Sequence, residues 1–226
     1  MVLTELVKQL DVELSQLQNQ QFELYADLLI EWNQKINLTA ITDRQDIYIK
    51  HFYDSLLLEK LFKPQGNICD VGSGAGFPGI PLAISNPQLN VCLIEPIEKR
   101  CNFLRHVCQQ LNLNNVEVIN SRAEDFKEKK FEFVTSRAVA PLNILSELCI
   151  PLVQLNGHFI AMKGPRAFEE VEEAKKGIDL LGGKIIKITE SKLPNEQTRI
   201  CIDILKTKET PIKYPRHYSK IKKNPL

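Results

Sequence analysis

The segment from Ile68 to Gly79 constrains the fold more than any other part of this chain. A short apolar stretch ends at Asp70, and four glycines follow within eight positions: Gly72, Gly74, Gly76 and Gly79. Glycine tolerates positive φ and has no Cβ, so a loop of this kind lets a ligand approach the backbone closely. The segment therefore predicts a strand, a tight turn and a helix that together bind a nucleotide-like cofactor.

Two kinds of cofactor fit this loop. Residues 74–79 match the G-x-G-x-x-G pattern of dinucleotide-binding enzymes, in which a pyrophosphate occupies the N-terminus of the next helix. S-adenosylmethionine has no phosphate; it needs a tight turn for its amino-acid end and a polar residue that organises the turn and the ammonium group. Asp70 suits that task, whereas beside a pyrophosphate it would face like charge. The loop favours S-adenosylmethionine and leaves an NAD-dependent oxidoreductase as the alternative.

A second acidic residue follows the next predicted strand. The apolar stretch 90–94 ends at Glu95, about twenty residues beyond the glycine loop, where a carboxylate can reach a ribose diol. Both cofactors carry an adenosine ribose, so Glu95 supports a Rossmann-like unit without choosing between them. The alternative interpretation is a solvated carboxylate at the start of the next helix.

Composition places the chain among ordinary globular proteins. Of its 226 residues, 43% are hydrophobic and 25% charged. No apolar run is long enough to cross a bilayer, and Met1 to Lys8 lacks the pattern of a signal peptide, so we expect a cytoplasmic protein with no membrane partner. The six cysteines form no C-x-x-C pair; we expect buried thiols and no metal site.

The net charge of +1 hides an asymmetry between the two ends of the chain. Six acidic residues stand against Lys8 alone between Glu5 and Glu31. The last stretch is basic and includes Lys206, Lys208, Lys213, Arg216, Lys220, Lys222 and Lys223. This pattern is typical of a flexible phosphate-binding arm, but equally of a solvated, frayed terminus.

The hydrophobic periodicity predicts an α/β fold preceded by helices. Residues 3–17 and 22–36 read as amphipathic helices. Strands are expected at 67–71, 91–95, 116–120, 131–136, 157–163, 184–190 and 198–205, with helices, such as 97–111, between the earlier ones. The last two strands follow each other directly and should form an antiparallel hairpin at one edge. We expect an N-terminal helical extension (1–64) packed on the core, a doubly wound, mainly parallel seven-stranded domain (65–208) and a basic tail (209–226).

Several segments together resemble one family. They are Asn37–Ala40, His51–Ser55, Asp70–Leu82, Ser121–Glu124 and Ser136–Ala138, and they are similar to the RsmG (GidB) family of bacterial small-subunit rRNA methyltransferases. The resemblance implies a Rossmann-like class I methyltransferase fold that transfers a methyl group from S-adenosylmethionine to N7 of a guanine in 16S rRNA, position 527 by the conventional RNA count. Its partner would be 16S rRNA or the small ribosomal subunit, and we expect a monomer.

The resemblance also implies residue roles. Gly72 and Phe77 would line the methionine side of the cofactor, with Gly74 in the same loop; Ala123 and Glu124 would flank the adenine. The alternative for the latter two is a helix start capped by Ser121.

Cations follow several of the predicted strands and carry the expected RNA contacts. Arg137 would lie near the methyl-transfer cleft, where it could bind the cofactor carboxylate or an RNA phosphate; the alternative is a surface ion pair. Phosphate contacts are expected from Arg122, Arg137, Lys163, Arg166, Arg199 and the basic tail with Lys222 and Lys223. A non-catalytic nucleic-acid-binding module is the alternative of a different class.

N7 of guanine needs no catalytic base, because it carries an in-plane lone pair and no proton. The enzyme can act by holding donor and acceptor in line. His51 and Asp54, three residues apart on one face of a predicted helix, could orient the histidine or close the cleft. A structural pairing of the two is favoured, because N7 methylation does not need a histidine base.

Overall fold

A seven-stranded sheet forms the centre of the computed structural model, which describes residues 3–226. The strands are β1 (Asn67–Val71), β2 (Asn90–Ile94), β3 (Val116–Ile119), β4 (Phe131–Arg137), β5 (Val153–Lys163), β6 (Gly183–Lys192) and β7 (Thr198–Lys206). Their order is β3-β2-β1-β4-β5-β7-β6. Strand β7 runs antiparallel to both of its neighbours, β5 and β6, and the other neighbouring strands are parallel to each other. The predicted mainly parallel sheet with a terminal hairpin is confirmed.

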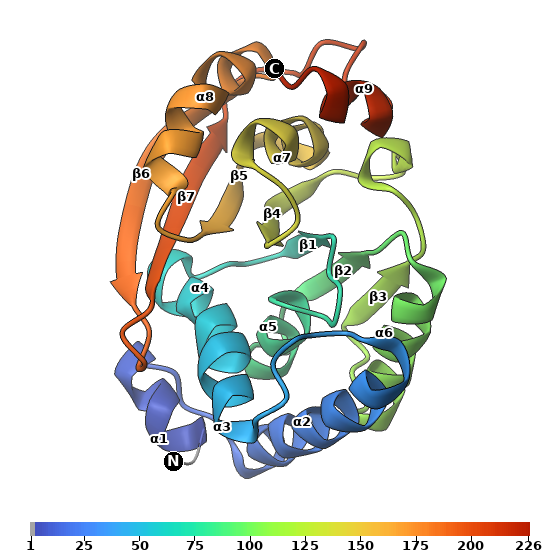
Figure 1. Cartoon of the computed structure of the whole chain (residues 1–226), viewed down its shortest axis with the longest axis vertical. Helices are drawn as coiled ribbons and strands as arrows, with labels where there is room; N and C mark the ends of the chain where they lie inside the picture. The colour runs from blue at the N-terminus through green and yellow to red at the C-terminus, as the bar shows by residue number, and fades with distance from the viewer. Residues whose placement is uncertain (1–2) are drawn as a thin grey trace.

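Helices cover both faces of this sheet (Figure 1). They are α1 (Leu3–Val7), α2 (Gln16–Ile36), α3 (Arg44–Ile47), α4 (Asp54–Phe62), α5 (Gly79–Ser85), α6 (Glu98–Gln110), α7 (Leu142–Cys149), α8 (Ala167–Leu180) and α9 (Tyr218–Lys223). A π-helical segment, Tyr48–Tyr53, joins α3 to α4, and short 3-10 turns occur at Lys8–Leu10, Ala123–Asp125 and Ile150–Leu152. Within residues 3–226, no helix is both long and apolar enough to cross a membrane.

Two hydrophobic cores lie on opposite faces of the sheet. The larger joins the N-terminal helices, α5 and α6 to one face, and includes Phe22, Tyr25 and Phe52. The smaller joins α7, α8 and α9 to the other face. The N-terminal helices therefore complete one layer of the sheet domain instead of standing apart from it. The division of the chain at residue 64 stays a prediction.

The N-terminal helices differ from the prediction in one respect. The expected stripe over residues 3–17 is wrong because the chain breaks at Asp11, which adopts φ 57°. Helix α2 then starts afresh after Ser15, whose hydroxyl accepts from Gln18 N while the Gln18 side chain accepts from Ser15 N. This capping box satisfies N–H groups that a continuous helix would have bonded internally. Leu17 lies beyond the break and is 64% exposed.

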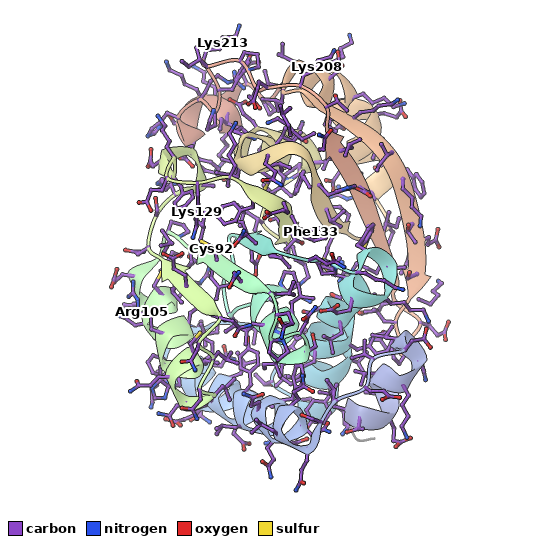
Figure 2. The ribbon with its side chains drawn as sticks, turned by 180° about the vertical axis from the view of Figure 1, so that it is seen from behind. Cys92, Arg105, Lys129, Phe133, Lys208 and Lys213 are labelled. Atoms are coloured by element: carbon purple, nitrogen blue, oxygen red, sulfur yellow. The ribbon has the colours of Figure 1, made fainter. Side chains whose placement is uncertain are left out.

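The basic tail packs onto the domain. Arg216 bonds the fully buried Glu147 on α7 through its backbone N–H and its guanidinium, at 2.5 to 2.8 Å. Ile221 on α9 is buried, and Leu226 lies against Gly177 on α8. Cations such as Lys213 project outward at this end of the molecule (Figure 2). These contacts correct the flexibility that both interpretations gave this segment, while phosphate binding by its cations stays a prediction.

Candidate active site

The glycine loop connects the end of β1 to α5. Gly72 N donates to Ile94 O at 2.8 Å, and the backbone takes positive φ at Gly72, Gly74 and Gly76. A Cβ on Gly72 would lie 2.5 Å from a methyl carbon of Val139. Both the backbone conformation and the neighbouring side chain therefore require glycine at residue 72.

Asp70 supports this loop from the end of β1. Its side chain is fully buried, and its Oδ2 accepts from Gly79 N at 2.9 Å, which fixes the first turn of α5. Its Oδ1 has no hydrogen-bond partner among the described residues, and burial raises the pKa of Asp70 to about 7. The predicted organisation of the turn is confirmed. Asp70 is not among the residues that line the cavity described below, and its contact with an ammonium group stays a prediction.

Glu95 closes β2 and binds the same loop. Its Oε2 accepts from Gly74 N and its Oε1 from Ile97 N, both at 2.9 Å. The side chain is almost completely buried, and Arg100 approaches Oε2 at 3.8 Å. The alternative of a solvated carboxylate at the head of α6 is wrong.

A cavity of about 480 Å³ lies at the carboxyl ends of the parallel strands. Its volume is within the range of small-molecule and cofactor sites. The lining includes eight residues predicted from the sequence: Gly72, Gly74, Phe77, Glu95, Arg122, Ala123, Glu124 and Arg137. The fold thus brings together the ends of β1, β2, β3 and β4, where open α/β sheets bind ligands. A group of side chains able to hold a metal ion is not found within residues 3–226.

Ala123 and Glu124 lie at one end of the cavity. They open a 3-10 turn that Ser121 does not cap; the Ser121 hydroxyl donates to Arg122 O instead. Glu124 is buried, and its Oε1 accepts from Tyr218 N at 3.3 Å. The alternative of a Ser121-capped helix is wrong.

Arg137 lies at the other end, at the close of β4. Its Nη1 donates to Asp54 Oδ2 at 2.7 Å and to Lys50 O at 3.1 Å, and its Nη2 donates to His51 Nδ1 at 3.1 Å. The guanidinium carbon lies 5.1 Å from the ring centroid of Phe77. With a side chain only 8% exposed, Arg137 forms a buried ion pair, so the alternative of a surface pair is wrong.

Asp54 holds a second arginine as well. Arg199 Nε donates to Oδ1 and Arg199 Nη2 to Oδ2, both at 2.6 Å, in a bidentate arrangement. Asp54 is fully buried and makes no direct hydrogen bond with His51. The predicted pairing of His51 with Asp54 is therefore corrected: both residues bind Arg137, which lies between them.

His51 is held neutral at the cavity wall. Burial and the nearby Arg137 lower the pKa of His51 to about 3. Because Arg137 can only donate, Nδ1 must accept, and Nε2–H donates to Thr39 Oγ1 at 3.0 Å. The imidazole stacks on Phe77 with centroids 4.3 Å apart and planes 9° from parallel. His51 belongs to the π-helical segment, a local irregularity that occurs frequently at functional sites.

The predicted phosphate contacts divide into two groups. Lys163 donates to Ala140 O and pairs with Glu170, each at 2.6 Å, while Arg199 is committed to Asp54 and to Lys163 O. Both cations therefore stabilise the fold, and their contact with RNA stays a prediction. Arg122 lines the cavity and is exposed, and Arg166, Lys222 and Lys223 are exposed as well.

Three site residues were missed by the sequence analysis. Tyr25 on α2 donates to Ala75 O in the glycine loop and stacks on Phe77; its place on an apolar stripe indicated only a core residue. Thr39 binds His51, and the family-like stretch Asn37–Ala40 was the available signal. Tyr218 also lines the cavity; its place among the cations of the basic tail indicated only a phosphate-binding arm.

Comparison with known proteins gives one consistent result. A family model described as "GidB: rRNA small subunit methyltransferase G" matches residues 18–200. A "Ribosomal RNA small subunit methyltransferase G" from Oceanobacillus iheyensis is 46% identical over 228 residues, which cover 97% of this chain and 96% of that protein. A protein of the same name from a Geobacillus strain is 49% identical, covering 91% and 90%.

Solved structures support the fold. An O-methyltransferase from Bacillus cereus in complex with SAH superposes with a TM-score of 0.57 at 18% identity, covering 81% of this chain and 91% of that one. The YcgJ protein from Bacillus subtilis gives 0.55 at 13% identity, covering 70% and 100%.

Proposed function

Because this chain belongs to the GidB family of small-subunit rRNA methyltransferases, and is an S-adenosylmethionine-dependent enzyme, we propose that it methylates N7 of a guanine in 16S rRNA, position 527 by the conventional RNA count. The observation that carries this choice is the state of His51. Both of its ring nitrogens are hydrogen-bonded, and its pKa is lowered to about 3, so it does not serve as a base near neutral pH. An acceptor without a proton to remove suits such a cleft.

The carboxylates that line the cavity are engaged in the same way. Glu95 accepts two backbone N–H groups, and Glu124 accepts from Tyr218 N. Carboxylates bonded to backbone N–H groups hold the loops that would bind and orient the reactants. Such orientation can lower the activation free energy by several kcal/mol.

The reaction then needs no proton transfer. Bound S-adenosylmethionine would supply an electrophilic methyl group to the N7 lone pair and would leave as S-adenosylhomocysteine, with the positive charge passing to the guanine. Arg137, stacked against Phe77 and held by Asp54, gives the cleft a fixed cation that suits the cofactor carboxylate or an RNA phosphate.

We place the cofactor along the cavity from the family resemblance and, for the ribose, from the position of Glu95 at the end of β2. The methionine end would lie at Gly72 and Phe77, the ribose at Glu95, and the adenine at Ala123 and Glu124. Exposed cations at Arg166, Lys222 and Lys223, together with Arg122 at the cavity, would contact the RNA backbone.

The decisive experiment is transfer of labelled methyl from S-adenosylmethionine to 16S rRNA from cells that lack this enzyme. Nuclease digestion and chromatography should place the label in N7-methylguanosine. Gly72→Asp and Arg137→Ala should abolish incorporation, with circular dichroism showing that both variants fold. Label in another nucleoside would refute the N7 assignment, and full activity of both variants would refute the site. Naked rRNA, an assembling particle and the finished subunit should be compared in parallel.

A further inference from the structure

The C-terminal segment forms a wall of the cofactor cavity. Tyr218, the first residue of α9, lines this cavity beside Arg122, Ala123 and Glu124. Tyr218 follows Glu124 by 94 residues, so segments distant in sequence form this wall of the cavity.

Strong contacts fix this segment on both sides of Tyr218. On one side, Arg216 bonds the buried carboxylate of Glu147, whose neighbour Leu148 also lines the cavity. On the other side, Ile221 is fully buried and Leu226 packs on Gly177. The fold therefore sets the position of Tyr218 at the wall of the cavity.

Two further contacts orient Tyr218 itself. Its backbone N–H donates to Glu124 Oε1 at 3.3 Å, and the Arg122 guanidinium lies over its ring at 5.7 Å from the centroid. The side chain is half-buried and packs against the core under α7 and α8. An aromatic ring held in this way offers an apolar face to a flat ligand at low entropic cost, because little motion is left to lose.

We propose that Tyr218 is a cofactor-binding residue whose ring contacts the adenine of S-adenosylmethionine. The proposal rests on the proposed function only in placing the adenine at Ala123 and Glu124. We assign the contact to the ring of Tyr218 and not to its hydroxyl. Tyr218 lines the cavity beside Ala123 and Glu124, where the adenine would lie, and a flat base can stack on an aromatic ring or meet its edge. Base–aromatic contacts of this kind correspond to about ten-fold in affinity.

The test is calorimetric titration with S-adenosylhomocysteine. Tyr218→Ala should weaken binding about ten-fold, and Tyr218→Phe should bind within about two-fold of the wild type. Ile212→Ala, a fully exposed position in the same basic segment, is the matched control and should change nothing. Competition by adenosine should weaken in Tyr218→Ala, while competition by methionine should not. Equal affinity of Tyr218→Ala and wild type would overturn the proposal.

A second measurement separates this proposal from the proposed function. In the wild type, hydrogen exchange at residues 216–223 should slow when S-adenosylhomocysteine binds; unchanged exchange would count against Tyr218. If the wild type binds the ligand and methylates rRNA while Tyr218→Ala behaves identically, only the role of Tyr218 fails. If the wild type does not bind S-adenosylhomocysteine at all, the proposed function fails with it. Circular dichroism and melting temperature should confirm that each variant is folded.

Discussion

Asp54 and Asp70 are both fully buried near the same cavity, but their surroundings differ. Asp54 accepts from two guanidinium groups, those of Arg137 and Arg199. Asp70 accepts from one backbone N–H, that of Gly79, and its second oxygen has no partner among the described residues. One carboxylate is the centre of an ion network, and the other holds a turn without a bonded cation.

This difference predicts how each aspartate behaves. Removing Asp54 would leave two buried cations without their counter-charge, which is costly in a poorly solvated site. Removing the charge of Asp70 would relieve a site that already disfavours ionisation, since burial raises its pKa to about 7. Residue type and burial alone therefore do not reveal what a buried acid contributes; its hydrogen-bond donors do.

The largest effect is expected for Asp54→Ala. We expect a loss of about 3–5 kcal/mol in the free energy of unfolding, because Arg137 and Arg199 lose their shared partner. Urea denaturation measures the change. The control is Asp46→Ala, which removes a half-exposed carboxylate paired with Lys50 and should cost less than about 1 kcal/mol. A loss below about 1 kcal/mol for Asp54→Ala would show that the network does not stabilise the fold.

Arg137→Lys tests whether geometry or charge matters at the cleft. Lysine keeps the positive charge but cannot bond Asp54, Lys50 O and His51 together as the planar guanidinium does. We expect kcat/KM for methyl transfer to fall by about ten-fold or more. The change should be measured alongside affinity for S-adenosylhomocysteine. Wild-type kcat/KM in the lysine variant would mean that the charge alone suffices.

Asp70→Asn should change how stability depends on pH. The folded-state pKa of about 7 lies above the ordinary value of 3.8, so between these values the folded chain retains a proton that the unfolded chain has lost. The resulting stabilisation is present at low pH and is lost as pH rises towards about 7, with a slope of roughly 1 kcal/mol per unit. Because asparagine does not titrate, the unfolding free energy of the wild type relative to that of the variant should fall as pH rises over this range. Urea denaturation of both proteins over this pH range measures the difference, and parallel profiles would exclude Asp70 as its source.

The smallest effect is expected at His51. Its pKa of about 3 means that it stays neutral throughout the weakly acidic to neutral range, so it should add no inflection to the pH–rate profile there. Nitrogen NMR should show an Nε2–H tautomer throughout, as the contacts with Arg137 and Thr39 require. A His51 signal that titrates near the ordinary value of 6.5 would refute this state and weaken the argument for a base-free reaction.

Local sequence patterns predicted the fold well. Apolar periodicity located all seven strands, and the glycine loop located a cavity of suitable size, because both depend on neighbouring residues. Partners distant in sequence were not predictable. Arg199 follows Asp54 by 145 residues, and only the folded sheet shows that this acid binds this cation. The pairing of Lys163 with Glu170 is local by comparison, because Glu170 lies in the first turn of the helix that follows β5.

The antiparallel direction of β7 places Arg199 beside Asp54. Residue 163 ends β5 and pairs with residue 200, so β7 begins beside the carboxyl ends of the parallel strands. A parallel strand in the same place would begin beside their amino ends. The wall of the cavity also draws on residues from Leu38 to Tyr218. During synthesis, a nascent chain therefore lacks a complete site until residue 218 has left the ribosome.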